Sequence, residues 1–328
     1  MAICITSAAS YIPEEIITNK DLSKRFNQKF DVEEWILQKT GVVERRKSNL
    51  SPSKQGFLAA KDLLEKDGND IDFIIVNTFT GDYTLPQTAT LIQEKLGLDQ
   101  AFAFEINMPC AGPVYALSIA EMFLKSGRYS KGLLIGVDKM LDAIDPEDFL
   151  MNVLFGEGAG ALIVEKKESI INKGIIDFYL GSYIEGDVGE DYSLKVLAGK
   201  SNYPIQNYTL NQKDHFLQME GRKVKNFICE KLNESINWLL SKHIKTVDDL
   251  DYIITHQANK VVIEKCLKDQ GIPSSKILKT VEFLGNTGSG SIYITIAEHF
   301  ARFSEKNKKI LICGMGGGLT WGAIFYKT

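Results

Sequence analysis

Cys110 is the residue whose type and position most directly suggest covalent chemistry. In FEINMPCAGPVYALSIAEMF, an apolar run typical of a buried strand end gives way to helical spacing, with Val114 and Leu117 on one face. Pro113 is tolerated only in a first helical turn, so a helix is expected to begin near Cys110 or Ala111. The positive end of a helix dipole stabilises thiolate, so we expect a thiol pKa below the usual value of about 8.5. The alternative is a small buried apolar residue, as most cysteines are.

A weak internal repeat relates this region to the second half of the chain. DFIIVN and DYIITH begin 179 residues apart, SIAEMF and TIAEHF 177, LLIGVD and ILICGM 177, and GALIVEKK and GAIFYKT 162. Four matches in the same order indicate duplication. We therefore predict two homologous halves, residues 1–170 with the cysteine and residues 171–328.

The repeat points to two further polar side chains. Position 287, beside Asn286 in GNTGSGSI, corresponds to Cys110, and His256 in THQAN corresponds to Asn77 at a strand end. A thiol, an imidazole and a carboxamide are thus expected at strand ends or helix starts of the two halves. Taken singly, His256 could be a core histidine and Asn286 a turn residue.

Glycine-rich runs could supply backbone donors. GMGGGLTWGA and FGEGAGALIV precede or contain strands, and neither has the GxGxxG spacing or the lysine of a nucleotide-phosphate loop. An oxyanion hole beside a nucleophilic thiol fits these runs better.

Strands and helices alternate in both halves, which predicts an α/β fold with parallel or mixed sheets covered by helices. In the first half the expected strands are 73–76, 133–137 and 161–164, and the expected helices are 86–96 and 114–125. Two α/β units around a pseudo-twofold would place the site where loops of both halves meet. The polar segment 181–218 is expected to run over the surface, either roofing a pocket or as a solvated loop.

Composition narrows the function classes. The 328 residues are 44% hydrophobic and 24% charged, with a formal charge of −4, so the chain is expected to fold and not to be a general nucleic-acid binder. No apolar run reaches the 18 or so residues of a membrane helix, and the first residues lack a basic signal region, so a cytoplasmic protein is expected. The five cysteines form no CxxC pair and are expected as reduced thiols. The histidines show no metal-binding spacing, so no metal is expected.

Six segments in order resemble the 3-oxoacyl-acyl-carrier-protein synthase III family of condensing enzymes: EEWILQKTGVVERR, PCAGPVYALSIA, FGEGAGALIV, THQAN, GNTGSGSI and GMGGGLTWGA. The resemblance implies a thiolase-like fold, with two duplicated halves packed as a five-layered αβαβα core. It implies that Cys110 is the nucleophile, that His256 and Asn286 are its catalytic partners, and that the backbone N–H groups of Cys110 and Gly317 form the oxyanion hole.

The implied reaction transfers an acyl group from acyl-CoA or an acyl-carrier protein to Cys110. A malonyl-carrier protein then loses CO₂ and condenses with that acyl group to a 3-oxoacyl product, in fatty-acid initiation or specialised metabolism. Coenzyme A or phosphopantetheine thioesters enter only as substrates, no resident cofactor is implied, and a homodimer is expected.

Substrate contacts carried over from the family are less regular. Trp35 matches a tryptophan beside the adenine of coenzyme A, but Lys39 and Phe149 stand at two arginine positions, and Phe149 cannot pair with phosphate. The donor is therefore either carrier-bound or a coenzyme A thioester held differently. Leu85 matches the position that closes the acyl pocket across a dimer, and Asn259 of THQAN is included among the substrate contacts.

A carrier-protein docking surface is also implied. Arg222, Lys223 and Lys225 lie at the start of an expected helix, in the region where the family binds its acidic carrier. An ordinary solvated helix face is the alternative.

Other functions share parts of this pattern. An acyltransferase could pass the acyl group from Cys110 to an alcohol, an amine or water without decarboxylation. A silent subunit of a condensing complex would need no nucleophile. A cysteine protease would share the order Cys, His, Asn, but its flanking residues are absent.

Overall fold

Two five-stranded sheets carry the apolar runs of the sequence. The structure, a computed structural model, describes residues 1–168, 172–184, 192–204 and 211–328. In the first sheet β4 is parallel to β5 and β6, while β7 is antiparallel to β6 and β1. Its strands, in spatial order, are β1 (Ala2–Tyr11), β7 (Gly158–Lys167), β6 (Lys131–Asp138), β4 (Phe73–Asn77) and β5 (Phe102–Ile106).

The second sheet repeats this arrangement. There β11 is parallel to β12 and β13, while β14 is antiparallel to β13 and β8. Since β8 corresponds to β1 and β11 to β4, both sheets have the same strand order and directions. The boundary expected at residue 170 lies outside the described residues, so the division at that residue stays a prediction. In spatial order the strands are β12 (Ile277–Leu278), β11 (Tyr252–Thr255), β13 (Lys309–Gly316), β14 (Thr320–Lys327) and β8 (Gly174–Ser182).

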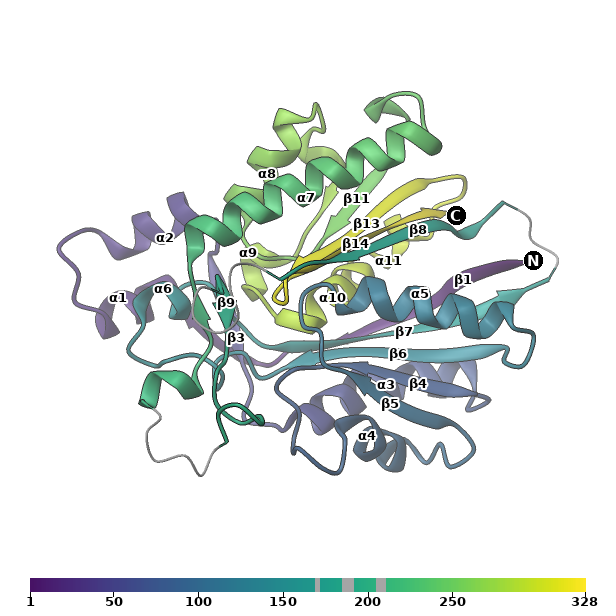
Figure 1. Ribbon diagram of the computed structural model, residues 1–328, viewed down its shortest axis with the longest axis horizontal. Helices are drawn as coiled ribbons and strands as arrows, with labels where there is room; N and C mark the ends of the chain where they lie inside the picture. Colours follow the sequence, from purple (N-terminus) through teal and green to yellow (C-terminus); the bar gives the residue numbers. More distant parts are fainter. Residues whose placement is uncertain (169–171, 185–191, 205–210) are drawn as a thin grey trace.

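Helices cover both faces of each sheet. Helices α5 (Gly112–Lys125) and α10 (Ser291–Glu298) lie between the sheets (Figure 1) and share one apolar core with strands of both. On the outer faces, α3 (Pro52–Asp67) and α4 (Thr88–Leu96) cover the first sheet, and α7 (Gly221–Lys242) and α8 (Lys260–Asp269) cover the second. The result is five layers, αβαβα, as the family resemblance implies.

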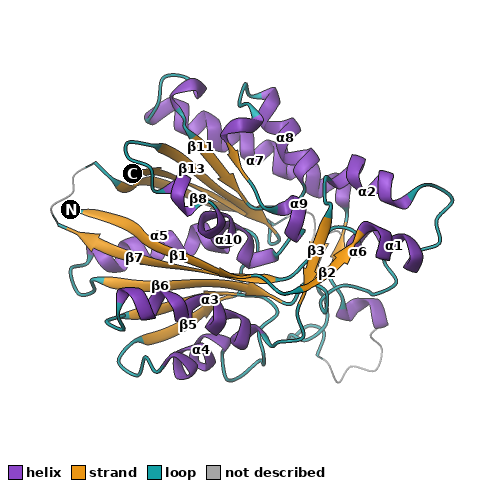
Figure 2. Ribbon diagram, turned by 180° about the vertical axis from the view of Figure 1, so that it is seen from behind, coloured by secondary structure: helices purple, strands orange, loops and turns teal. Residues whose placement is uncertain are grey.

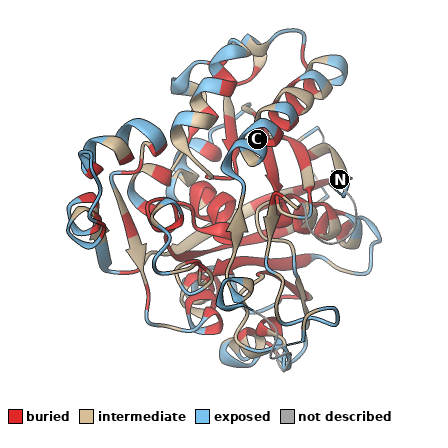
Figure 3. Ribbon diagram, turned by 60° about the vertical axis from the view of Figure 1, so that its left-hand side comes forward, coloured by how far each residue is buried: buried red, intermediate tan, exposed pale blue. Residues whose placement is uncertain are grey.

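Side-chain alternation along the strands explains these layers. In β4, Phe73 and Ile75 contact the central core, while Ile74 and Val76 contact the outer helices. Each strand is therefore apolar on both faces, as in sheets covered on both sides. Figure 3 shows the buried sheets enclosed by outer helices whose far sides are exposed.

The predicted elements of the first half are confirmed, with differences at their ends. β7 begins at Gly158, three residues before the expected strand start at residue 161, so the strand takes in part of the glycine-rich run. At Gly160 a Cβ atom would lie 2.5 Å from the backbone nitrogen of Ile294 in α10. The glycine lets the central helix approach the sheet closely.

Shorter elements extend one end of the molecule, where β2 and β3 pair beside α1, α2 and α6 (Figure 2). The short elements of the described chain, at this end and elsewhere, are β2 (Glu15–Thr18), α1 (Asn19–Arg25), α2 (Val32–Thr40), β3 (Glu44–Lys47), α6 (Phe149–Asn152), β9 (Leu194–Lys195), η1 (Gln212–His215), β10 (Gln218–Met219), η2 (Val247–Asp249), η3 (Ser274–Lys276), α9 (Val281–Leu284), η4 (Gly288–Gly290) and α11 (Phe300–Phe303).

Candidate active site

One cavity of about 610 Å³ brings together the three side chains singled out by the sequence. Cys110, His256 and Asn286 all line it, from loops of both halves. Residues of the segment 181–218 also line it, including Leu194 and Leu217. This agrees with the interpretation that the segment covers a pocket, and not with a fully solvated loop. Much of the remaining wall is apolar and includes Phe79, Met140, Leu154, Phe155, Leu194, Leu217, Met219 and Met315.

Cys110 lies on a turn two residues before α5, which begins at Gly112 with Ala111 as its cap. The expected helix start is therefore correct to within two residues. The backbone N–H of Gly317 lies near the thiol and acts to lower its pKa. A Cβ at Gly316 would overlap Cβ of Cys110 and lie 2.8 Å from its sulfur, so only glycine leaves room for the thiol.

The expectation of a lowered thiol pKa is wrong for this structure. Burial raises the pKa of Cys110 to about 12, the negative charge of Asp138 adds to this rise, and the Gly317 N–H opposes it. Loss of hydration penalises the thiolate more than the nearby helix terminus stabilises it. The resting thiol is accordingly neutral at physiological pH.

Alkylation of Cys110 should follow this raised pKa. Between about pH 7 and about pH 10 we expect the iodoacetamide rate to rise about tenfold per pH unit, because thiolate is a small fraction that grows with pH. Peptide-level mass spectrometry would give the rate at this cysteine, with urea-unfolded protein as the control. A plateau near about pH 8 in the folded protein would contradict the raised pKa.

His256 follows β11 and is only 2% exposed. Its backbone N–H donates to the carbonyl of Cys313 at 2.8 Å, which ties the turn to β13. Burial lowers the pKa of the imidazole to about 3, so the ring is neutral at pH 7.

The hydrogen bonds of Ser291 assign the tautomer of His256. The Ser291 hydroxyl lies 2.7 Å from Nδ1, and its oxygen accepts the Gln257 backbone N–H at 3.4 Å. In the described part of the chain no other acceptor is recorded for the hydroxyl proton, so we assign this proton to the hydrogen bond with Nδ1. The ring proton then sits on Nε2, which makes His256 a neutral N–H donor.

Replacing Ser291 by alanine should weaken that donor. For the condensation that the family resemblance implies, we expect the rate of the Ser291→Ala variant to fall about tenfold, since Nδ1 loses its partner and the tautomer is no longer fixed. Acylation of Cys110 should be unchanged, and Ser291→Thr should restore condensation. The control is Ser118→Ala, because the hydroxyl of this buried serine donates to the Val114 carbonyl of its own helix. Equal losses in acylation and condensation would argue for general damage instead.

Asn286 is held by both its backbone and its side chain. Its N–H donates to the Leu154 carbonyl at 2.9 Å, and its carbonyl accepts the Gly156 N–H at 3.0 Å. Its Oδ1 accepts the Gly288 N–H at 3.0 Å. Because the carbonyl end of the carboxamide is engaged, Nδ2 is the end available as a donor.

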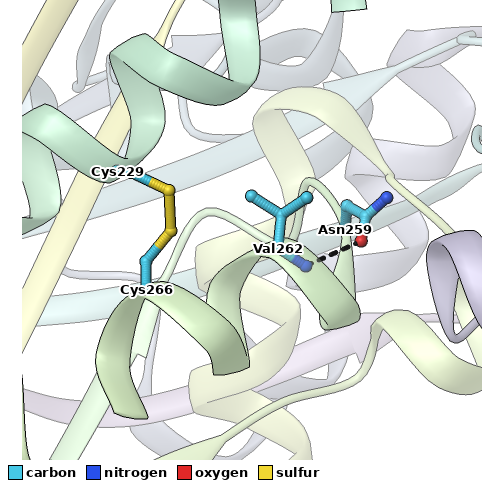
Figure 4. The surroundings of a disulfide bond; sticks show 4 residues. All are labelled: Cys229, Asn259, Val262 and Cys266. Carbon is cyan, nitrogen blue, oxygen red and sulfur yellow. Dashed lines mark hydrogen bonds between the residues drawn. A yellow bond between two sulfur atoms is a disulfide. The ribbon is translucent and has the colours of Figure 1, made fainter. Parts of the chain in front are cut away.

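The other predicted site residues divide into two groups. Gly317, Asn259 and Lys225 line the cavity. Asn259 caps α8 by accepting the Val262 N–H at 3.0 Å (Figure 4), and its Nδ2 donates to the Lys39 carbonyl at 3.1 Å. Six predicted residues lie outside the described wall of the cavity: Trp35, Lys39, Leu85, Phe149, Arg222 and Lys223.

Trp35 and Phe149 form an aromatic cluster with Phe30. The ring centroids of Trp35 and Phe149 are 5.3 Å apart, and Phe30 lies 5.7 Å from Trp35. Rings this close leave no space for a third ring between them. Leu85, by contrast, is 79% exposed in the single chain.

The expectation that all five cysteines are free thiols is wrong. Cys229 of α7 and Cys266 of α8 form a disulfide, with 5.4 Å between their Cα atoms (Figure 4). Their separation of 37 residues shows no pairing motif, and packing of α7 on α8 brings them together. Cys4, Cys110 and Cys313 are free.

Two residues beside the site escaped the sequence analysis. Ser291 lies five residues after Asn286, and Asp138 ends β6. The repeat could have drawn attention to the strand end at Asp138, but neither side chain has a distinctive motif. Among the described residues no group of three or more His, Cys, Asp or Glu side chains is placed to hold a metal ion. None of the helices described is long and apolar enough to cross a membrane.

Similar proteins were found for the whole chain. The family model for 3-oxoacyl-[acyl-carrier-protein] synthase III matches residues 104–183, and its C-terminal counterpart matches residues 240–328. A beta-ketoacyl-[acyl-carrier-protein] synthase III of Chlorobium chlorochromatii is 34% identical over 100% of this chain and 99% of its own. One from Streptococcus mutans is 36% identical over 98% of both chains.

Solved structures show the same fold. A 3-oxoacyl-[acyl-carrier-protein] synthase III from Aquifex aeolicus superposes with a TM-score of 0.88 at 30% identity, covering 100% of both chains. The priming β-ketosynthase of the R1128 polyketide pathway gives 0.85 at 26% identity, covering 99% of this chain and 96% of its own.

Fold and site together define a thiolase-like condensing enzyme, a transferase of acyl groups. The sequence matches to the relatives from Chlorobium chlorochromatii and Streptococcus mutans cover at least 98% of this chain and of each relative. The chain belongs to the 3-oxoacyl-acyl-carrier-protein synthase III family. The predicted fold class, family and condensing activity are thereby confirmed.

Proposed function

We propose that the cavity holds an acyl group on Cys110 and joins it to a malonyl thioester with loss of CO₂. The observation that carries this assignment is the convergence of a thiol, a neutral imidazole and an oriented carboxamide on one largely apolar cavity. The roles of the individual residues follow from what each group can donate.

In the first step the sulfur of Cys110 attacks the acyl thioester carbonyl. The C–S bond to the donor breaks, and the departing thiol carries away the proton that the cysteine loses. The tetrahedral oxyanion accepts hydrogen bonds from the backbone N–H groups of Cys110 and Gly317. The Gly317 N–H already acts to lower the thiol pKa in the free protein, so it lies close to the reacting sulfur.

In the second step a malonyl thioester loses CO₂, and the electrons of the broken C–C bond form an enolate. Nε2–H of His256 and Nδ2–H of Asn286 stabilise its oxygen without transferring a proton, since the ring is neutral and a carboxamide does not titrate. The enolate carbon attacks the acyl carbonyl. The Cys110 sulfur then leaves as thiolate, which releases the 3-oxoacyl product, and the thiolate takes up one proton from water. No resident metal or cofactor takes part in these steps.

The acyl donor is proposed to be bound to a carrier protein in preference to coenzyme A. Trp35 and Phe149 contact each other, and Phe149 offers no charge to a nucleotide phosphate. Lys195, Lys200 and Lys225 line the cavity and give it a basic rim that suits an acidic carrier. Arg222 and Lys223 are exposed at the start of the same helix as Lys225, and Lys223 forms an ion pair with Glu220.

A homodimer is proposed from the edge of the first sheet. β5 pairs only with β4 among the described strands, so its other edge is unpaired. Three apolar side chains are exposed: Phe102 on this strand, Met122 on α5, and Leu85. Unpaired edges with apolar side chains are typical of surfaces covered by a partner. We further propose that the enzyme acts in the cytoplasm.

The test is an assay with purified protein, malonyl-carrier protein and matched acyl donors on carrier protein and on coenzyme A. The expected result is a 3-oxoacyl-carrier product with one CO₂ released per product, formed faster from the carrier-bound donor. Esters or amides formed from added alcohols or amines without CO₂ release would overturn the proposed reaction. Equal or faster use of acyl-CoA would overturn the donor preference alone.

A further inference from the structure

Asp138 is a carboxylate with 0% exposure at the end of β6, where the two halves meet beside the cavity. No ion pair with a Lys, Arg or His is recorded for it in the described ranges of the chain. The ammonium of its neighbour Lys139 is directed elsewhere, to the Ser48 carbonyl and to Glu157. Asp138 is therefore stabilised by hydrogen bonds and not by a cation.

Its two oxygens hold different halves of the chain. Oδ1 accepts from the hydroxyl groups of Thr78 and Thr80, both at 3.0 Å, and from the backbone N–H groups of Phe79 at 2.9 Å and Thr80 at 3.3 Å. Oδ2 accepts from the backbone N–H of Ser289 at 2.7 Å. One carboxylate thus links the turn after β4 to the loop after α9.

Both of the linked segments form the site. Phe79 and Thr80 line the cavity from the first half, and Asn286 and Gly288 line it from the second. Gly288 has a φ of +55°, and a Cβ there would lie 2.5 Å from Oδ2 of Asp138. Gly288 also donates the hydrogen bond that orients the Asn286 carboxamide. The position of the carboxamide therefore depends on how closely this loop approaches Asp138.

The negative charge of Asp138 also disfavours the thiolate form of Cys110. Burial raises its own pKa, and its negative charge helps to raise the pKa of Cys110, which opposes thiolate formation. His256, which lines the same cavity, is neutral and adds no charge there. A neutral side chain would not raise the thiol pKa in this way. A carboxamide, however, has only one oxygen and could not accept hydrogen bonds from both the turn after β4 and Ser289.

We propose that Asp138 is a positioning residue, whose carboxylate fixes the loop carrying Asn286 against the turn after β4 and so sets the carboxamide donor opposite Cys110. The inference rests on the proposed condensation and deepens it. Displacing one donor by about 1 Å can cost on the order of 100-fold in rate. The Asn286 loop is therefore expected to serve decarboxylation, while the thiol itself is held separately by the glycine turn at Gly317.

The test is the Asp138→Asn variant. Asparagine has nearly the same shape as aspartate, but its NH₂ group would face hydrogen-bond donors either in the turn after β4 or at Ser289, so one of the two links would be lost. We expect CO₂ release by the acylated enzyme to fall about 100-fold in kcat, with little change in the KM for the malonyl thioester. Alkylation of Cys110 at about pH 8 should become faster, because the removal of a negative charge lowers the thiol pKa. Asp72→Asn is the matched control, since Asp72 accepts the N–H groups of Ser130 and Lys131 at the opposite end of the same sheet.

Opposite changes in alkylation and condensation would support the positioning role, because general destabilisation does not speed one and slow the other. Thermal unfolding of both variants would be measured alongside. Parallel loss of acylation and condensation, or unchanged condensation, would overturn the proposal. Failure of the proposed function is distinguishable, because the unmodified protein would then release no CO₂ with any acyl donor.

Discussion

A Cys110→Ser variant should form no acyl-enzyme, and its condensation rate should fall on the order of a million-fold, as when other covalent catalysts lose their nucleophile. A serine hydroxyl is far less acidic than the Cys110 thiol, even though burial raises the pKa of that thiol. Almost no alkoxide is therefore present at neutral pH. The measurement is mass spectrometry of the intact protein and its peptides after incubation with acyl donors.

Cys4→Ser is the matched control, because Cys4 is free and lies on β1, away from the residues that line the cavity. It should acquire the acyl group at position 110 as the unmodified protein does. An acyl group found on another residue of the Cys110→Ser protein at an undiminished rate would show that the nucleophile has been wrongly assigned.

Removal of the His256 imidazole should separate the two halves of the reaction. In His256→Ala we expect condensation to fall on the order of 100- to 1,000-fold, the usual cost of losing one donor to a developing oxyanion. Acylation of Cys110 should continue, because its oxyanion donors are backbone groups. Rapid-quench measurements would follow acyl-enzyme formation and CO₂ release in the same sample.

His299→Ala provides the comparison for this variant. His299 is also hydrogen-bonded, through Nε2 to the Lys279 carbonyl at 3.0 Å, but it does not line the cavity. Its rates should match those of the unmodified protein. If His256→Ala slowed acylation as much as condensation, the imidazole would be acting on the thiol and not on the enolate.

Neighbouring residues were enough to predict much of the fold and the identity of the central side chains. Runs such as the one at Phe73 are apolar on both faces, so they could only be strands covered on both sides. The repeat then related the strand ends and helix starts of the two halves. Cys110, His256 and Asn286 occupy those positions, and all three line the cavity.

Such sequence patterns do not predict the interactions between distant parts of the chain. The helix start beside Cys110 suggested a lowered pKa, yet loss of hydration and the charge of Asp138 reversed the direction. The contact between Trp35 and Phe149 depends on the packing of two helices more than a hundred residues apart. The disulfide between Cys229 and Cys266 likewise depends on the packing of α7 against α8.

The sequence by itself determined which groups can react, because side-chain chemistry and local spacing are written in neighbouring residues. Only the tertiary structure decided their protonation and direction. Burial sets the charge state of the thiol and imidazole, and partners such as Ser291 and Gly288 orient the donors. Burial and these hydrogen bonds arise only when the two halves pack together, so they depend on the whole fold and not on any one segment.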